Sequence, residues 1–278
     1  HCQMKKNRQR KDNELTAQEK YVKSLRQYKS RVSVYRLLIF LCFTGLWEIA
    51  ADLGWIDFFF FSSPSRIVSC LVDLTLHRSL LLHTGITLFE TLISFLLVIL
   101  AGMTCATILW YSKTASEVLE PYLVVLNSLP KSALAPLFIV WLGTGTTTII
   151  VAGISVALFG AIISLYTGFK QVDPEMITLI YTLGGNKRDA FVKAVLPGSI
   201  PTVLSTMKVN IGLALVGVII GEFLAARRGL GYLIIYGSQV FQMHMVITSI
   251  LILCIIAMGL YLLIQFAEQR YLKKTSKK

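Results

Sequence analysis

The chain has 278 residues, of which 55% are hydrophobic and only 15% are charged, and its formal net charge is +12. Soluble globular domains are about 45–50% apolar and about 25% charged, so this composition argues against a soluble enzyme, a disordered chain or a nucleic-acid-binding protein. The basic residues are concentrated in the two tails and in short loops between apolar segments, which is typical of membrane orientation signals.

Residues 1–34 form a basic, mostly polar tail. Thr16 and Glu19 have the spacing of a capping box, and Tyr21 and Leu25 follow at helical intervals. The tail therefore predicts an amphipathic helix that lies on the inner leaflet, either as an orientation anchor or as a regulatory element. A cleaved signal peptide is not expected, because the first apolar run starts only after this tail.

Six apolar stretches are long enough to cross a bilayer as helices, which takes about 20 residues each. In chain order they are residues 35–53, 84–111, 122–142, 146–169, 202–224 and 245–266. The sequence Gly143-Thr144-Gly145 predicts a tight connection between the third and fourth stretches. We therefore expect an all-α membrane protein with a six-helix transmembrane domain over residues 35–268 and a second basic tail over residues 269–278.

The distribution of Lys and Arg predicts the orientation. An even number of spans places both termini on one side of the membrane. With the tails inside, 21 Lys and Arg lie inside and four lie outside. The positive-inside rule then favours cytoplasmic termini in a bacterial cell membrane.

Motifs of catalytic and metal-binding proteins do not occur in the sequence. The five cysteines form no CxxC pair and no cluster with histidine, so we expect buried, small apolar side chains and neither a disulfide framework nor a metal site. The patterns GxxxxGK[ST], HExxH and GxSxG are missing. We therefore expect no catalytic residues and no cofactor in this chain.

The loop over residues 170–198 differs from the other polar loops. Asp173 can cap a helix, and the glycine pair 184–185 can end it. Asn186 can cap a second short helix over residues 187–195. The first helix carries more apolar surface than a solvated loop needs, which indicates a contact with another protein or with neighbouring helix ends.

This loop resembles that of the transmembrane subunits of type I ABC importers, which follows the pattern EAA, three residues, Gly, nine residues, Ile-x-Leu-Pro. Gly184 and Leu196-Pro197 fit this frame, whereas the EAA triplet falls on Thr178-Leu179-Ile180, which is a poor match. The resemblance implies that a separate ABC ATPase subunit binds the loop. The residues expected in that contact are Met176, Thr178, Leu179, Ile180, Leu183, Gly184, Gly185, Leu196 and Pro197.

Residues 126–143, with the sequence LNSLPKSALAPLFIVWLG, are very similar to the third-span signature of the nitrate, sulfonate and taurine type of importer. Glu222 and residues 229–232 also fall where that family has them. Glu90 is a departure, because the family more often has Arg at this place. The resemblance implies the type I ABC importer permease fold.

The third span also has a physical interpretation of its own. Pro130 and Pro136 each remove a backbone donor, so the helix should kink or break between them. Freed carbonyl groups and Lys131 at membrane depth favour a translocation path, and the alternative is that Lys131 reaches the lipid headgroups. The candidate path residues are Asn127, Pro130, Lys131, Ser132, Pro136 and Glu222.

Alternatives stay open for the fifth span. Lys208 lies near the inner end of the fifth span, so contact with the lipid headgroups is favoured over contact with substrate. Glu222 either lines an outer gate or has a structural role as a cap or as an ion-pair partner of arginines 227–228. Gly217 and Gly221 have GxxxG spacing, which lets another helix approach either within the chain or across a dimer seam.

Together, the sequence and the resemblance predict the permease subunit of an ATP-driven importer that forms the path for a small, anionic or vitamin-precursor solute by alternating access. The expected partners are the ATPase, which holds ATP and magnesium, a substrate-binding protein, a second copy of the chain and the lipid bilayer. The alternative is a stand-alone secondary transporter or channel. Such proteins usually place acidic groups at the bilayer midplane, whereas Glu48, Glu90 and Glu222 lie towards span ends.

Overall fold

The computed structural model describes residues 17–57, 61–76 and 79–275, and every regular element in these ranges is a helix. The chain divides into two compact units, residues 1–66 and residues 67–278. Helix α4 (Pro64–Leu76) begins in the first unit and ends in the second. The all-α fold class is therefore confirmed for the described part of the chain.

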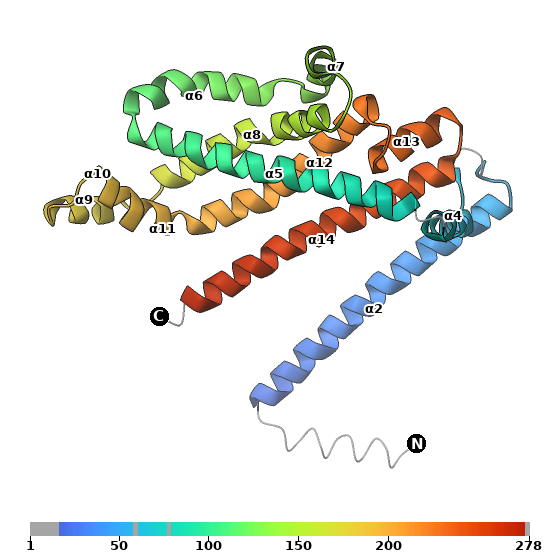
Figure 1. Ribbon diagram of the computed structural model, residues 1–278. Helices are drawn as coiled ribbons and strands as arrows, with labels where there is room; N and C mark the ends of the chain where they lie inside the picture. Colours follow the sequence, from blue (N-terminus) through green and yellow to red (C-terminus); the bar gives the residue numbers. More distant parts are fainter. Residues whose placement is uncertain (1–16, 58–60, 77–78, 276–278) are drawn as a thin grey trace. The chain divides into compact units, whose positions relative to one another are not determined.

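The main element of the first unit is the long helix α2 (Ala17–Asp52), drawn in blue in Figure 1. Its segment Ser30–Asp52 is long and apolar enough to cross a membrane, and it contains most of the predicted first span. No break separates this segment from the part that starts at Ala17. The predicted interfacial helix and the first span are thus one continuous helix, while Thr16 of the predicted capping box lies outside the described residues.

At the centre of the second unit, α8 (Thr146–Lys170) packs along both α5 (Ser79–Tyr111) and α12 (Ile200–Ala225), as Figure 1 shows. The three helices bury small side chains at their contacts, such as Ala157 and Ala214, which are both fully buried. Small residues let helix backbones approach closely, and this close approach builds the core of the unit.

The glycines of α12 serve this contact. A Cβ atom at Gly217 would lie 2.7 Å from the Cα atom of Gly153, and one at Gly221 would lie 2.9 Å from the Cα atom of Ile149. Both neighbours belong to α8. Of the two predicted uses of the GxxxG pair, the structure shows packing within the chain.

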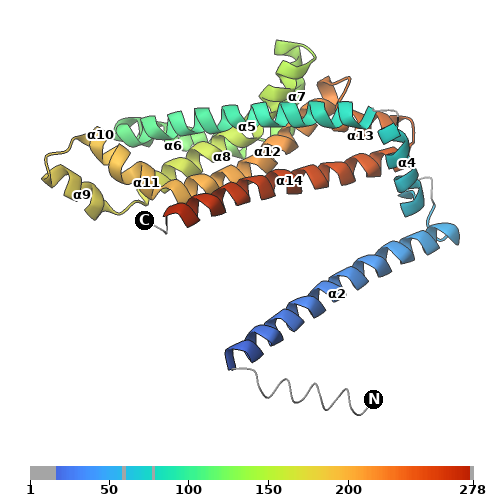
Figure 2. The same ribbon diagram turned by 60° about the horizontal axis from the view of Figure 1, so that its bottom comes forward.

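The last two helices, α13 (Leu230–Gln239) and α14 (Met243–Thr275), pack against each other and against α12. Helix α14 continues past the predicted end of the sixth span at residue 266. Helix α13 follows the fifth span, in a segment for which the sequence analysis named no helix. Figure 2 shows that α9 and α10 lie at one end of this unit, while α7 and α13 lie towards the other end.

The predicted third span is not one straight helix. It falls on α6 (Lys113–Ser128) and α7 (Lys131–Leu142), whose axes are bent by 94° at the break between them. Five helices in the described residues are long and apolar enough to span a membrane, and the bent pair makes a sixth if it counts as one span.

The cysteines match their prediction only in part. The four described cysteines are free thiols. Cys70 is buried, Cys105 is part-buried, and Cys42 and Cys254 are exposed.

Candidate functional site

The 170–198 loop is built from short helices that follow one another closely. Their bounds are α9 (Pro174–Thr182), α10 (Lys187–Ala190), the π-helical turn η1 (Phe191–Val195) and α11 (Leu196–Gly198). Asp173 caps α9 by accepting a hydrogen bond from the backbone N–H of Glu175 at 2.9 Å. Asn186 and Asp189 form a reciprocal capping box at the start of α10. Both predicted caps are confirmed.

The predicted stop between these helices is also confirmed. Gly184 has a φ of +81°, a conformation that side chains with a Cβ atom rarely adopt. The N–H of Gly185 donates to the carbonyl oxygen of Ile180 at 2.9 Å, and a Cβ atom at Gly185 would lie 2.5 Å from Cγ2 of Ile180. The two glycines therefore have different roles, the first in the backbone conformation and the second in the close packing of the turn.

Helix α9 exposes its apolar side chains. Met176 is 51% exposed, Leu179 is 58% exposed and Leu183, at the end of the helix, is 78% exposed. Among the predicted contact residues, Ile180 and Gly185 are part-buried, and the others are exposed. An apolar surface of this kind on a polar loop is typical of a protein contact.

The loop is attached firmly to the ends of two long helices. Lys187 donates a hydrogen bond to the carbonyl oxygen of Tyr111 at 2.8 Å, and its ammonium group lies 5.8 Å from the ring centre of Trp110. The ring of Phe191 packs against Trp110 at 5.1 Å and against Phe169 at 5.5 Å between centroids. These contacts tie the loop to the ends of α5 and α8.

The break in the third span lies at Pro130. This residue precedes α7 with extended backbone (φ −69°, ψ 94°), whereas Pro136 lies inside α7 without interrupting it. The break was predicted between the two prolines, and the structure places it at the first one. Pro130 lies outside the helix, where its missing N–H costs no helical hydrogen bond.

Lys131 has a partner at this break. Its ammonium group donates to the carbonyl oxygen of Asn127, one of the groups that the break sets free. Asn127, Pro130, Ser132 and Pro136 are exposed in this chain. The structure thus brings Asn127 and Lys131 together, but Glu222 has other neighbours.

Glu222 is 1% exposed and holds a backbone turn. Its Oε1 accepts a hydrogen bond from the hydroxyl of Thr87 at 2.6 Å, and its Oε2 accepts one from the N–H of Gly231 at 2.6 Å. Thr87 also accepts a hydrogen bond from the N–H of Leu230 at 2.8 Å. These contacts match the structural role that was the alternative to an outer gate. The partners of Glu222 are a hydroxyl and a backbone N–H, and not the arginines at positions 227 and 228.

The same turn explains the two glycines that follow. Gly229 has a φ of +117°, and its N–H donates to Nδ1 of His83 at 2.9 Å. A Cβ atom at Gly229 would overlap the carboxylate of Glu222, and one at Gly231 would lie 2.7 Å from Oε2 of Glu222. The carboxylate of Glu222 therefore fits only because positions 229 and 231 are glycines, and the turn in return depends on the hydrogen bond to this carboxylate.

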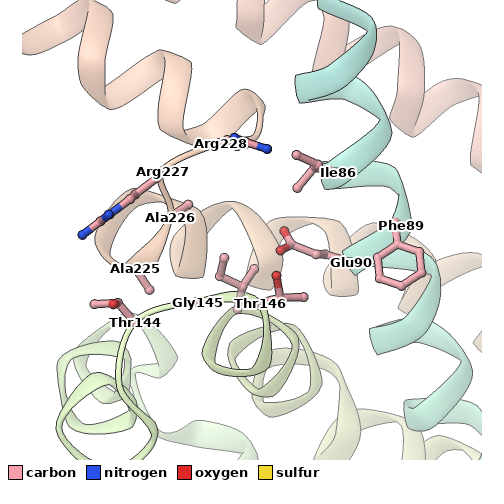
Figure 3. Close-up of a pocket in the computed structure, with 11 residues that line it drawn as sticks. Ile86, Phe89, Glu90, Thr144, Gly145, Thr146, Ala225, Ala226, Arg227 and Arg228 are labelled. Atoms are coloured by element: carbon pink, nitrogen blue, oxygen red, sulfur yellow. The ribbon is translucent and has the colours of Figure 1, made fainter.

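Beside this turn lies a pocket of about 610 Å³, shown in Figure 3 and called here the Glu90 pocket. It is lined by Ile86, Phe89, Glu90, Thr144, Gly145, Thr146, Ile149, Ala225, Ala226, Arg227 and Arg228. Glu90 is 1% exposed, and its Oε2 has no hydrogen-bond partner in the described part of the chain. Its carboxyl group interacts with that of Glu222, and the side chain of Thr146 is its other close neighbour.

Lys208 is paired within the chain. Its ammonium group forms an ion pair of 2.7 Å with Glu268 of α14, and the two side chains are 19% and 17% exposed. The expected headgroup contact is therefore replaced by a link between α12 and α14. The partner lies 60 positions further along the chain, so local sequence patterns could not identify it.

A polar stripe on α5 carries a signal that the sequence interpretation missed. His83, Thr87, Glu90, Thr91 and Ser94 recur at helical intervals of three and four within an apolar span. The last four are at most 1% exposed. Polar side chains on one face of an apolar helix indicate a face turned to other protein groups, and this spacing could have marked the turn and the Glu90 pocket.

Residues 98–277 match the family described as "Binding-protein-dependent transport system inner membrane component". The chain is 30% identical to a probable ABC transporter permease protein of Haemophilus influenzae, over 85% of this chain and 96% of that protein. It is 29% identical to a formylaminopyrimidine transport permease protein of Halalkalibacterium halodurans, over 70% of this chain and 77% of that protein.

A putative aliphatic sulfonates transport permease protein of Bacillus subtilis is 25% identical over 85% of this chain and 86% of its own length. Among solved structures, an amino acid ABC transporter matches with a TM-score of 0.59 at 17% identity, over 72% of this chain and 97% of that chain. The inward-facing MetNI methionine ABC transporter matches with a TM-score of 0.57 at 18% identity, over 68% and 93%. The chain belongs to the family of binding-protein-dependent transport system inner membrane components, the permease subunits of ABC transporters.

Proposed function

We propose that this permease subunit serves an ATP-driven importer, and that the 170–198 loop is the contact through which a separate ATPase subunit drives it. The exposed apolar side of α9 carries the proposal, with Met176, Leu179 and Leu183 more than half exposed. The attachment of Lys187 to Tyr111 supports it, because closure of two ATPase subunits would then move α5 together with the loop. The ATPase would hold ATP and magnesium, and this chain would hold no cofactor.

We further propose that two copies of the chain form the path along their α6 and α7 helices. These helices expose large apolar side chains, including Tyr122 at 65%, Val140 at 80% and Trp141 at 68%. A second copy would cover such a surface and leave the broken segment facing a cavity. The proposed path residues are Asn127, Pro130, Lys131, Ser132 and Pro136, while Glu222 supports the turn after α12.

The proposed cargo is a small anion or a vitamin precursor that a substrate-binding protein delivers. The names of the relatives, which include an aliphatic sulfonates permease and a formylaminopyrimidine permease, support this range. Both termini are proposed to be cytoplasmic in a bacterial membrane, on the 21-to-4 distribution of Lys and Arg. Accessibility labelling at Lys278 and at Ser63 should report opposite sides, and labelling from one side would contradict the orientation.

A Gly184→Val variant tests the coupling loop. Gly184 has a φ of +81° and open space around it, so the substitution strains only the backbone at the helix stop. The variant should reach the membrane but lose stimulation of ATPase activity by the loaded binding protein in lipid vesicles. Gly54→Val is the matched control, because Gly54 has a φ of +71°, equally open space and a position outside the loop.

A Leu179→Glu variant tests the same contact by chemistry. Leu179 is 58% exposed, so a carboxylate there is tolerated in the free subunit but lacks a partner once the apolar contact forms. Binding of the ATPase should weaken while the amount of folded permease stays the same. Normal stimulation in both Leu179→Glu and Gly184→Val would exclude this loop as the coupling element.

A Lys131→Met variant tests the path. Transport should fall while assembly with the ATPase persists, because a residue beside the path affects passage and not folding. Lys113→Met, at a side chain that is 90% exposed, is the control and should transport normally. Loss of both folded protein and transport in Lys131→Met would show that the bond to Asn127 is structural.

A further inference from the structure

Glu90 presents a buried acceptor without a donor. The side chain is 1% exposed, and its Oε2 has no hydrogen-bond partner among the described residues. Buried carboxylate oxygens in folded proteins are nearly always paired, because removing them from water is costly. Glu90 also lines the pocket of about 610 Å³, so the free oxygen lies beside a space large enough for a small solute.

Its neighbour Glu222 supplies no donor to this Oε2 atom. Both oxygens of Glu222 already accept hydrogen bonds, from Thr87 and from Gly231. The two carboxyl groups interact with each other, and two carboxyl groups in contact do not both carry a negative charge unless a positive group lies nearby. Glu90 lines the pocket, so a solute that binds there can bring the positive group.

The rim of the pocket argues against a bare metal ion. Arg227 and Arg228 are exposed, and no carboxylate lies within ion-pair distance of either one in the part of the chain that the structure describes. Figure 3 shows Arg227 on the opposite side of the pocket from the carboxyl group of Glu90. No group of three or more metal-ligating side chains occurs among the described residues. Two guanidinium groups would repel a free cation but attract a solute that also carries a negative group.

We propose that the Glu90 pocket binds a small solute through a protonated amino or amidino group, with Oε2 of Glu90 as its main acceptor. The hydroxyls of Thr144 and Thr146 lie in the pocket wall as further acceptors. The arginines at positions 227 and 228 receive the negative end of the same solute. This inference rests on the proposed permease function and restricts its cargo from anions in general to solutes that carry both charges.

Matched solutes test the proposal. Equilibrium binding of radiolabelled taurine and β-alanine is compared with that of ethanesulfonate and propionate, which lack only the amino group. The protein is the permease with its ATPase in lipid nanodiscs, without ATP and without a binding protein. At least tenfold tighter binding of the amino compounds is expected.

Two variants test whether Glu90 causes the tighter binding of the amino compounds. Glu90→Gln keeps the shape and removes the charge, so binding of the amino compounds should fall at least tenfold while that of the other two stays unchanged. Glu117→Gln is the control, because its side chain is 67% exposed on α6, and it should retain the preference. The preference is measured in the unmodified protein, so the test stands even if Glu90→Gln folds poorly.

Three outcomes would overturn the proposal. They are equal binding of the amino and des-amino solutes, no binding of any of the four, and an unchanged preference in Glu90→Gln. If no solute binds but Glu90→Gln loses affinity for the binding protein, the donor is a Lys or Arg side chain of that protein and not a solute. Stimulation of the ATPase by the loaded binding protein is recorded in the same samples, and its presence without an amino preference would refute this inference alone.

Discussion

At one end of the second unit, the α9 and α10 helices are shaped by hydrogen bonds between close neighbours in the sequence. Asp173 binds the N–H of Glu175, and Asn186 and Asp189 bind each other across three positions. At the other end, the turn after α12 is held by Glu222 and Thr87, which are 135 positions apart in the sequence. One end is thus shaped locally, and the other depends on the packing of α5 against α12 and α13.

This difference predicts different responses to substitution. A loop with its own caps keeps its shape when its surroundings move, which suits a segment that transmits motion between two proteins. A turn held by buried, long-range hydrogen bonds loses its shape when any partner is lost. Changes at the turn should therefore lower stability, while changes in the loop should act mainly on coupling.

The largest effect is expected from Gly229→Ala. The new Cβ atom would overlap the carboxylate of Glu222, at a backbone position with a φ of +117°. Backbone strain and overpacking each cost about 1–3 kcal/mol, so the variant should be destabilised by about 3 kcal/mol or more. Thermal unfolding in detergent measures the effect. Gly212→Ala, at a position with no atom within 4 Å of the new methyl group, is the control.

A Gly229→Ala protein with the unfolding temperature of Gly212→Ala would contradict the long-range description of this turn. The hydrogen bonds around Glu222 would then have to adapt to a side chain that the observed positions exclude. Such an outcome would also remove the contrast between the two ends of the unit.

A loss of about 2 kcal/mol is expected from Thr87→Val, because hydrogen bonds are lost but no atoms overlap. This nearly isosteric change removes the donor to Glu222 and the acceptor for the N–H of Leu230, which leaves two buried polar groups unpaired. Each unpaired group costs about 1–3 kcal/mol, and unfolding temperature is again the measurement. Thr104→Val is the control, because Thr104 is exposed and bonds only within its own helix. Equal effects of the two changes would contradict the prediction.

The separation of donor and acceptor along the sequence also explains which features could be predicted from the sequence. The loop caps and the Gly184 stop were predictable, because donor and acceptor lie within a few residues. The break at Pro130 follows from proline chemistry, although the sequence did not decide which of two prolines would interrupt the helix. The partners of Glu222 and Lys208 were not predictable, because they depend on how distant helices pack.

The tether between the loop and α5 gives the third prediction. In Lys187→Met, the bond to the carbonyl of Tyr111 and the contact with the ring of Trp110 are lost. Stability should fall by only about 1 kcal/mol, but stimulation of the ATPase by the loaded binding protein should fall much more. Lys193→Met, which removes only an ion pair with Asp189 on the loop surface, is the control. Equal loss of stimulation in both would show that the tether is not specific.

The smallest effect concerns the capping box of α10 and its dependence on pH. The N–H of Asn186, and after it the ammonium group of Lys193, hold the pKa of Asp189 below its usual range. A lowered carboxyl pKa stabilises the folded loop at neutral pH, and this contribution is lost as the pH falls through the lowered value. Hydrogen-exchange protection of the α10 amides should therefore stay constant as the pH falls to the ordinary carboxylate range, and should decrease at lower pH.

Asn186→Ala should lower the protection at neutral pH by about 1 kcal/mol, because it removes the acceptor for the N–H of Asp189. Protection at the turn of Gly229 to Gly231 should not change in that variant, and a joint loss at both ends would mean that the loop is not shaped locally.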